Sequence, residues 1–262
     1  METERLAASI LASSGALLWD VFLEKSRVFS LTYEDKRVEK TAIGTDEGAA
    51  VRAIKNGKTS FAFTNDIRSI AGAAKTVAGS TGICDIAFNL MRPGITHTVR
   101  IPHNSMEPRG KIKLLKAADT LCRSIDPRIR QVSCSYSEKE QEITVLNDTG
   151  SYCHDKRVYT SFVVQVMAVS GSGRIETARG VISAHAGLEA VPEAEVMKKA
   201  EDTARLALRL LEAEKKIHGK MPVVLSSEAG GTMIHEAVGH SLEADLVQKD
   251  MSIYKGKQGS RV

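Results

Sequence analysis

The chain contains few aromatic residues and has no strong excess of charge. Phe, Trp and Tyr together make up 5% of its 262 residues, too few for the stacking platform on which single-stranded nucleic acids bind. The formal net charge is only +4. The most basic run, residues 108–116, alternates basic and apolar residues, which is typical of one face of a helix or strand rather than of a phosphate-binding stripe. We therefore expect no nucleic-acid partner.

Long apolar runs and paired cysteines are also missing. No stretch approaches the ~18 consecutive apolar residues of a membrane span. The N-terminus carries Glu2 and Glu4 where a secretory signal would have basic residues. The four cysteines form no CxxC pair, a usage typical of a reducing compartment. These absences predict a cytoplasmic protein that does not span or bind a membrane.

The hydrophobic pattern predicts mixed helices and strands. The expected elements are a helix at 3–25, two strands within 27–43 joined by a turn at 34–36, a hairpin within 47–66 that turns at Asn56-Gly57, a helix at 67–79, a helix at 107–124, strands at 130–137, 141–147, 157–169 and 174–184, a helix at 193–217 and a short buried strand at 221–227. The fold class is therefore α+β, with mixed helices and an antiparallel sheet in an N-terminal domain, followed by the start of a second domain.

One short segment carries chemistry: His235-Glu236-Ala237-Val238-Gly239-His240. Two imidazoles and a glutamate are the groups a zinc peptidase uses. Five residues of ideal α-helix, however, separate two side chains by about 140° around the axis. The spacing therefore requires a helix that is widened by one residue or ends before His240. A π-bulge provides such a residue, and Gly239 makes the distortion cheaper.

A structural reading of the same segment remains open, because two histidines within six residues also occur without a metal. The context favours the metal site. The segment follows a predicted strand and opens a helix that Ser226 or Ser227 caps. The paired glycines Gly230-Gly231 would allow another backbone to approach closely.

Two regions resemble one protein family. "HEAVGHSLEAD", preceded by "EAGGTMI", resembles the HExxxH signature of TldD-type members of the TldD/PmbA (TldE) metallopeptidases. The segment "YEDKRVEKTAIGTDEGAAVRAIKNGKTSFAFTND" at 33–66 is similar to the N-terminal part of these proteins in order and spacing. The resemblance thus extends over nearly the whole chain.

The resemblance implies a zinc-dependent peptidase subunit that cleaves short or unfolded peptides by metal-activated water. His235 and His240 would bind Zn²⁺, and Glu236 would be the general base. The family also implies a PmbA/TldE-like partner subunit or self-pairing. The implied domains are an α+β domain at 1–190, a connecting helix at 191–220 and the start of a C-terminal metallopeptidase domain at 221–262.

This chain departs from the family in one respect. Family members continue for roughly as many residues again, and that half supplies a cysteine as third zinc ligand. No cysteine here matches that position. Glu243, Asp245 and Gly239 are candidates for the surroundings of the metal or for the substrate cleft, and Glu243 is also a possible direct ligand. We expect this chain alone to have little or no peptidase activity.

Two other hypotheses come from different classes. A non-catalytic scaffold or partner-binding subunit would carry the same motif with an unfinished metal site. A cysteine hydrolase would use Cys153, although adjacent strand residues such as Cys153 and His154 point to opposite faces, and an edge cysteine is the simpler interpretation. His97 and His103 are interpreted as polar surface and receive no role.

Overall fold

The chain consists of two compact units. The computed structural model describes residues 2–79, 82–91, 98–214 and 218–261. Its internal contacts separate Met1–Ala213 (unit 1) from Glu214–Val262 (unit 2). The domain limits predicted at residues 190 and 220 remain predictions. Within the described ranges, no helix is both long enough and apolar enough to cross a bilayer.

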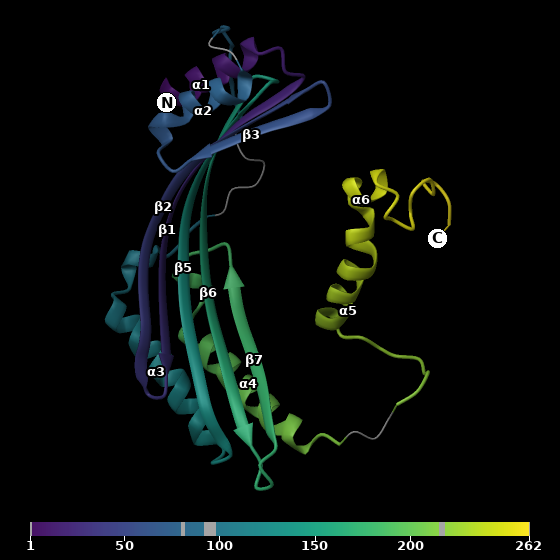
Figure 1. The fold of residues 1–262 in the computed structure, drawn as a ribbon. Helices are drawn as coiled ribbons and strands as arrows, with labels where there is room; N and C mark the ends of the chain where they lie inside the picture. Colours follow the sequence, from purple (N-terminus) through teal and green to yellow (C-terminus); the bar gives the residue numbers. More distant parts are fainter. Residues whose placement is uncertain (1, 80–81, 92–97, 215–217, 262) are drawn as a thin grey trace. The chain divides into compact units, whose positions relative to one another are not determined.

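Unit 1 is built on a single long-stranded sheet (Figure 1). In chain order its elements are α1 (Glu2–Ser13), β1 (Leu18–Glu34), β2 (Arg37–Lys55), β3 (Lys58–Thr64), η1 (Ile67–Ser69), α2 (Ile70–Ala78), β4 (Asn89–Met91), η2 (His103–Ser105), α3 (Pro108–Ile125), β5 (Ile129–Asn147), β6 (Ser151–Val169), β7 (Ile175–Ala184), η3 (Leu188–Ala190) and α4 (Glu193–Glu212). The strand order is β3-β2-β1-β5-β6, and both β4 and β7 pair with β6. All pairs are antiparallel except β4 with β6. The predicted α+β class is confirmed.

Two tight hairpins connect the first three strands. Asp35 and Lys36 have φ of 48° and 62°, and Asn56 and Gly57 have φ of 52° and 71°. Two consecutive left-handed residues are the geometry of a two-residue type I′ turn, whose twist matches that of the flanking strands. The turns predicted at 34–36 and at Asn56-Gly57 are confirmed.

Both helix pairs cover the same side of β1. Trp19 and Val21 are buried beneath α1 and α2, whereas Leu31 and Tyr33 are buried in the cluster that includes α3 and α4. All four are odd-numbered, and the register of β1 is unbroken from Leu18 to Thr32 against β2 and from Asp20 to Glu34 against β5. Since alternate residues of a strand share a face, the two helix pairs sit at opposite ends of one face (Figure 1).

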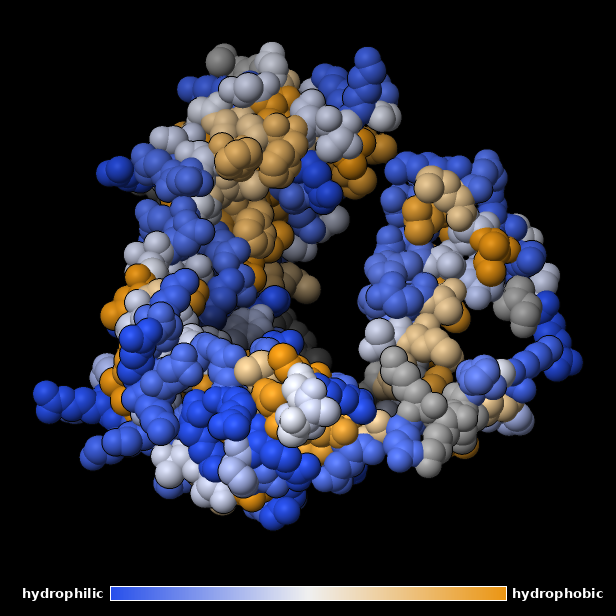
Figure 2. Space-filling model, turned by 60° about the horizontal axis from the view of Figure 1, so that its bottom comes forward, coloured by the Kyte–Doolittle hydropathy of each residue, from blue (hydrophilic) through white to orange (hydrophobic). Residues whose placement is uncertain are grey.

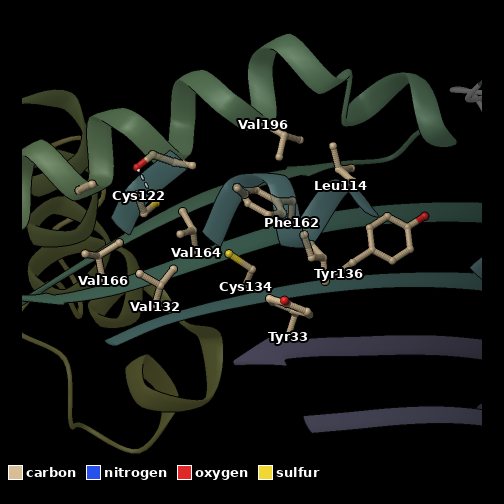
Figure 3. Close-up of a cluster of buried hydrophobic side chains, with 14 of the residues drawn as sticks. Tyr33, Leu114, Cys122, Val132, Cys134, Tyr136, Phe162, Val164, Val166 and Val196 are labelled. Atoms are coloured by element: carbon tan, nitrogen blue, oxygen red, sulfur yellow. Dashed lines mark hydrogen bonds between the residues drawn. The ribbon is translucent and has the colours of Figure 1, made fainter. Parts of the chain in front are cut away.

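The larger of the two cores joins α3 and α4 to the sheet. Figure 3 shows Phe162, Val164 and Val166 of β6 beside Val132 and Cys134 of β5, beneath the helices. The Cys122 thiol of α3 donates a hydrogen bond to the Ala200 carbonyl of α4 at 3.4 Å, which ties the two helices together. Burial raises the pKa of this thiol to about 12 and so keeps it in its inert neutral form.

Ion pairs between neighbouring strands occupy the middle of the sheet, between the two cores. Lys139 lies 3.2 Å from Glu24, Lys156 lies 3.4 Å from Glu142, and Lys25 pairs with Glu47. The polar residues 138–140 lie in this middle region, inside the continuous strand β5 (Ile129–Asn147). The two short strands predicted at 130–137 and 141–147 are both parts of β5.

The predicted helix at 3–25 is wrong beyond Ser13. The Ser13 hydroxyl donates to the Ile10 carbonyl at 2.9 Å, and Ser14 donates to the Leu11 carbonyl at 2.5 Å. Gly15 then adopts a left-handed φ of 69°, which ends the helix. The apolar residues from Leu17 onward begin a strand instead.

Two further predictions, one at the end of unit 1 and one in unit 2, are also wrong. The helix predicted at 193–217 ends at Glu212, and residues 215–217 lie outside the described part of the chain. Of the residues predicted to form a buried strand at 221–227, residues 221–226 are an exposed, irregular segment, in which Val224 is 99% accessible, and Ser227 begins a helix. No strand in the described ranges pairs with this segment, so its apolar residues have no sheet to pack into.

Gly180 of β7 allows α4 to pack closely on the sheet. A Cβ at this position would lie 2.1 Å from Thr203 Oγ1, and that hydroxyl is held by the Lys199 carbonyl at 2.7 Å. We predict that Gly180→Ala lowers the free energy of unfolding by about 1–3 kcal/mol through overpacking. Urea denaturation measures the loss.

The matched control is Gly44→Ala in β2, where a Cβ meets nothing within 4 Å. We expect it to change stability by less than about 1 kcal/mol. Equal losses in the two variants would contradict the steric explanation.

Candidate metal centre

The histidine motif lies in unit 2, within one nearly continuous helical segment. The elements are α5 (Ser227–Ile234), the π turn η4 (His235–Gly239), the 3-10 turn η5 (His240–Leu242) and α6 (Ala244–Gln248). The Ser226 hydroxyl accepts a hydrogen bond from the Ala229 N–H at 3.5 Å. Of the two predicted caps, Ser226 is therefore the one that the structure selects.

The helix is widened at the motif. The His240 N–H donates to the His235 carbonyl, an i→i+5 bond, and both residues keep right-handed helical backbone angles. The five-residue spacing allowed either a widened helix or a helix that ends before His240, and the structure has the widened form, a π turn. A Cβ on Gly239 would lie 3.8 Å from His235 Nδ1, so the glycine is not required for space. The prediction that its flexibility makes the distortion cheaper remains a prediction.

The π turn brings three potential ligand groups together. One atom each of His235, Glu236 and His240 lies within 4.8 Å of the others. The two imidazole rings meet edge to face with centroids 4.6 Å apart, and Glu236 Oε2 lies 3.6 Å from His240 Nε2. All three residues are exposed. The described residues thus present two imidazoles and one carboxylate toward a shared point.

Glu243 contacts the second histidine from its other side. Its Oε1 atom lies 2.5 Å from His240 Nδ1. The hydrogen bond and the charge of Glu243 raise the pKa of the His240 imidazole above its usual value. Asp245 has a different neighbour, since it lies 3.6 Å from Lys249. Of the two acidic residues suggested for the surroundings of the metal, Glu243 is the one in contact with a proposed ligand.

The other histidines considered from the sequence have different environments. His103 is 4% exposed and hydrogen-bonds Thr160 at 2.7 Å, so its interpretation as polar surface is wrong. The residues around His103 carry no sign of this burial, because its hydrogen-bond partner Thr160 lies 57 residues away in the sequence. His154 bonds Thr144 Oγ1 at 3.0 Å, next to a half-buried Cys153. His97 lies outside the described residues.

The surface of unit 2 is rich in apolar side chains. Figure 2 shows hydrophobic patches on this unit, the right-hand body of the view. The large apolar side chains that it exposes are Met221, Val223, Val224, Leu225, Met233, Ile234, Leu242, Met251 and Ile253. Exposed apolar area of this extent is typical of a surface that another chain or segment covers.

Three family models match the chain in sequence order. Residues 19–80 match the PmbA/TldA metallopeptidase domain 1, residues 101–211 match the central domain, and residues 218–262 match the C-terminal domain. The candidate metal centre lies in the segment that matches the C-terminal domain.

Curated relatives are similar over nearly the whole chain. A metalloprotease TldD homolog of Haemophilus influenzae is 30% identical over 93% of this chain and 53% of its own length. A metalloprotease of Methanothermobacter thermautotrophicus is 26% identical over 93% of this chain and 54% of its own length. The chain thus spans about half the length of these relatives.

Solved structures share the fold at low sequence identity. A Bacteroides thetaiotaomicron protein, described as a candidate modulator of DNA gyrase, superposes with a TM-score of 0.77 at 18% identity, over 98% of this chain and 60% of that one. TldE from Thermococcus kodakarensis gives a TM-score of 0.64 at 12% identity, over 95% and 57% of the two chains.

The Ser226 cap gives a direct test of how α5 is held. We predict that Ser226→Ala lowers the opening free energy of α5 by about 1 kcal/mol, because the Ala229 N–H loses its acceptor. Amide hydrogen exchange at Ala229 and in the following turn should then become about 5-fold faster. Ser227→Ala, at the first helical position, is the control and should leave exchange unchanged. If the two variants accelerate exchange equally, Ser226 is not the cap.

Proposed function

Because the chain belongs to the PmbA/TldD family of metallopeptidases, we propose that unit 2 carries the zinc-binding part of a peptidase site. The observation that carries the proposal is the π turn, which gathers His235, Glu236 and His240 within 4.8 Å. The proposed ligands are His235 and His240, and Glu236 is the proposed general base.

The donor set suits zinc. Neutral imidazoles are among the preferred ligands of Zn²⁺, and a catalytic zinc site leaves one position open for water or substrate. When bound, zinc would supply Lewis acidity that polarises a peptide carbonyl and makes water nucleophilic at neutral pH. The exposure of both rings leaves this side of the helix accessible to an incoming peptide.

Glu236 has the position of a proton carrier. Its carboxylate lies between the two ligand residues in sequence and 3.6 Å from one of them in space. A carboxylate there can accept the proton of the attacking water on an Oε atom and pass it to the leaving amine. That sequence of transfers hydrolyses a peptide bond without a covalent enzyme intermediate.

A catalytic zinc site has three protein ligands, and the cluster offers two histidines besides the proposed base. We propose that the third ligand comes from beyond the described residues, as the family's cysteine does. The alternative function is a non-catalytic scaffold or partner-binding subunit, favoured by the extensive apolar surface of unit 2.

Two further parts of the proposal, the substrate and the partner, rest on family membership, and a third, the compartment, rests on the cysteines. The substrate is a short or unfolded peptide, because such a peptide has no folded structure that would keep its backbone from the exposed helix face. The partner is a PmbA/TldE-like subunit, and the structural similarity to a TldE protein supports that class. The compartment is the cytoplasm, in keeping with four free thiols.

Zinc binding distinguishes the proposed peptidase function from the alternative of a non-catalytic scaffold. We predict that the purified 262-residue chain binds about one zinc ion per chain when zinc is supplied in excess, and that His235→Ala or His240→Ala strongly weakens this binding. His218→Ala, which removes an exposed histidine of the same unit outside the cluster, should leave zinc content unchanged. Elemental analysis after equilibrium dialysis against a series of zinc concentrations measures both the stoichiometry and the affinity, because two histidines without the third ligand hold the ion weakly. A wild-type chain without zinc would favour the scaffold.

The role of Glu236 is tested by a charge-neutral substitution. If Glu236 is a general base that does not bind the metal, the Glu236→Gln variant should keep the full zinc content. It should also reduce any hydrolysis of an unstructured peptide by about 10²–10⁴-fold. Loss of zinc in this variant would instead identify Glu236 as a ligand.

A further inference from the structure

We infer that Glu243 is a positioning residue, whose carboxylate holds the His240 ring through Nδ1 so that Nε2 faces the cluster. The inference deepens the proposed function and rests on it for the presence of the metal. The contact itself is a feature of the folded chain.

The two nitrogens of His240 have different neighbours. Nδ1 lies 2.5 Å from Glu243 Oε1, a short hydrogen bond. Nε2 lies 3.6 Å from Glu236 Oε2, within the cluster. The ring is thus oriented with Nδ1 held by Glu243 and Nε2 turned toward Glu236, while the His235 ring lies edge to face with it at a centroid distance of 4.6 Å.

The backbone explains why Glu243 reaches the ring. His240–Leu242 is a 3-10 turn, in which side chains three residues apart eclipse each other. The Glu243 N–H donates to the His240 carbonyl at 3.1 Å, and the Glu243 carbonyl accepts from Val247 N–H at 3.0 Å. These two bonds fix Glu243 between the end of one helical turn and the start of α6.

The chemical consequence is a defined tautomer. A carboxylate only accepts hydrogen bonds, so the His240 proton must lie on Nδ1. The neutral ring then keeps a free electron pair on Nε2, the atom that a metal requires. Carboxylate–histidine pairs of this kind also make the imidazole a better donor, and losing the carboxylate typically weakens metal affinity 10–100-fold.

The same geometry argues against Glu243 as a direct ligand. The two ring nitrogens project from different edges of the imidazole. An oxygen that accepts the Nδ1 proton therefore faces away from a metal held by Nε2. Ligation by Glu243 would require this hydrogen bond to break.

Glu243→Ala and Glu243→Gln test the assignment in the 262-residue chain. We expect Glu243→Ala to weaken zinc binding 10–100-fold, measured by competition with a chromophoric chelator. Glu243→Gln should lose less, because its amide oxygen still accepts from Nδ1. Asp250→Asn is the matched control: Asp250 pairs with Lys255 at 2.6 Å and has a φ of 62° that asparagine tolerates. It should bind zinc as the wild type does.

A second readout does not involve metal. Long-range proton–nitrogen NMR of the zinc-free chain, at a pH where His240 is neutral, reports the tautomer. We expect the Nδ1–H form in the wild type and in Glu243→Gln, and loss of this preference in Glu243→Ala. A folded Glu243→Ala that binds zinc as tightly as the wild type would overturn the inference, as would an Nε2–H tautomer in the wild type.

The remaining outcomes separate this inference from the proposed function. If Glu243→Gln loses as much zinc affinity as His240→Ala, Glu243 is a ligand and not a positioning residue. If the wild-type chain takes up no zinc, the proposed function fails. The tautomer then decides by itself whether Glu243 holds the ring.

Discussion

The candidate site depends on one constraint of helix geometry. Residues five apart in an α-helix point about 140° away from each other, so His235 and His240 could not share a ligand on a regular helix. The i→i+5 bond from the His240 N–H to the His235 carbonyl removes that divergence. The following 3-10 turn then places Glu243 beside the second ring. Two departures from regular helix, one wider and one tighter, therefore build the site from nine consecutive residues, 235–243.

In unit 1, the very long strands are covered by helices only toward their ends. β2, β5 and β6 each have 19 residues, and the two helix pairs bury different stretches of one face. Between these cores, cross-strand ion pairs replace apolar packing. Cross-strand pairs of opposite charge contribute only modestly to stability, so the backbone ladder and the two flanking cores hold this region.

Local features were the most predictable from sequence. The Asn56-Gly57 turn, the helices at 70–78 and 108–125, and the π turn all follow from short-range rules, and the structure contains each of them. The widening of the helix was predictable because only a distorted backbone lets the two histidines meet. The α+β class follows from the alternation of the two hydrophobic periods.

The errors arise where the hydrophobic pattern alone does not decide the structure. Leu17 and Val21 fit a helical period and a strand period equally well, and the serine-glycine break after Ser13 decided between them. His103 begins the short 3-10 turn η2, where Thr160, far away in sequence, provides a partner that allows its burial. Residues 221–227 have the composition of a strand, yet pairing depends on a neighbouring strand. The errors at His103 and at 221–227 thus concern partners distant in sequence, whereas the first concerns a local helix stop.

The central claim is that both histidines bind the same metal ion across the π turn. X-ray absorption at the zinc edge tests it most directly, because multiple scattering distinguishes imidazole from other ligands and allows the rings to be counted. The account predicts two imidazoles with Zn–N distances of about 2.0–2.1 Å, and one in either single His→Ala variant that still retains zinc when the metal is in excess. A wild-type spectrum with one imidazole or none would contradict it.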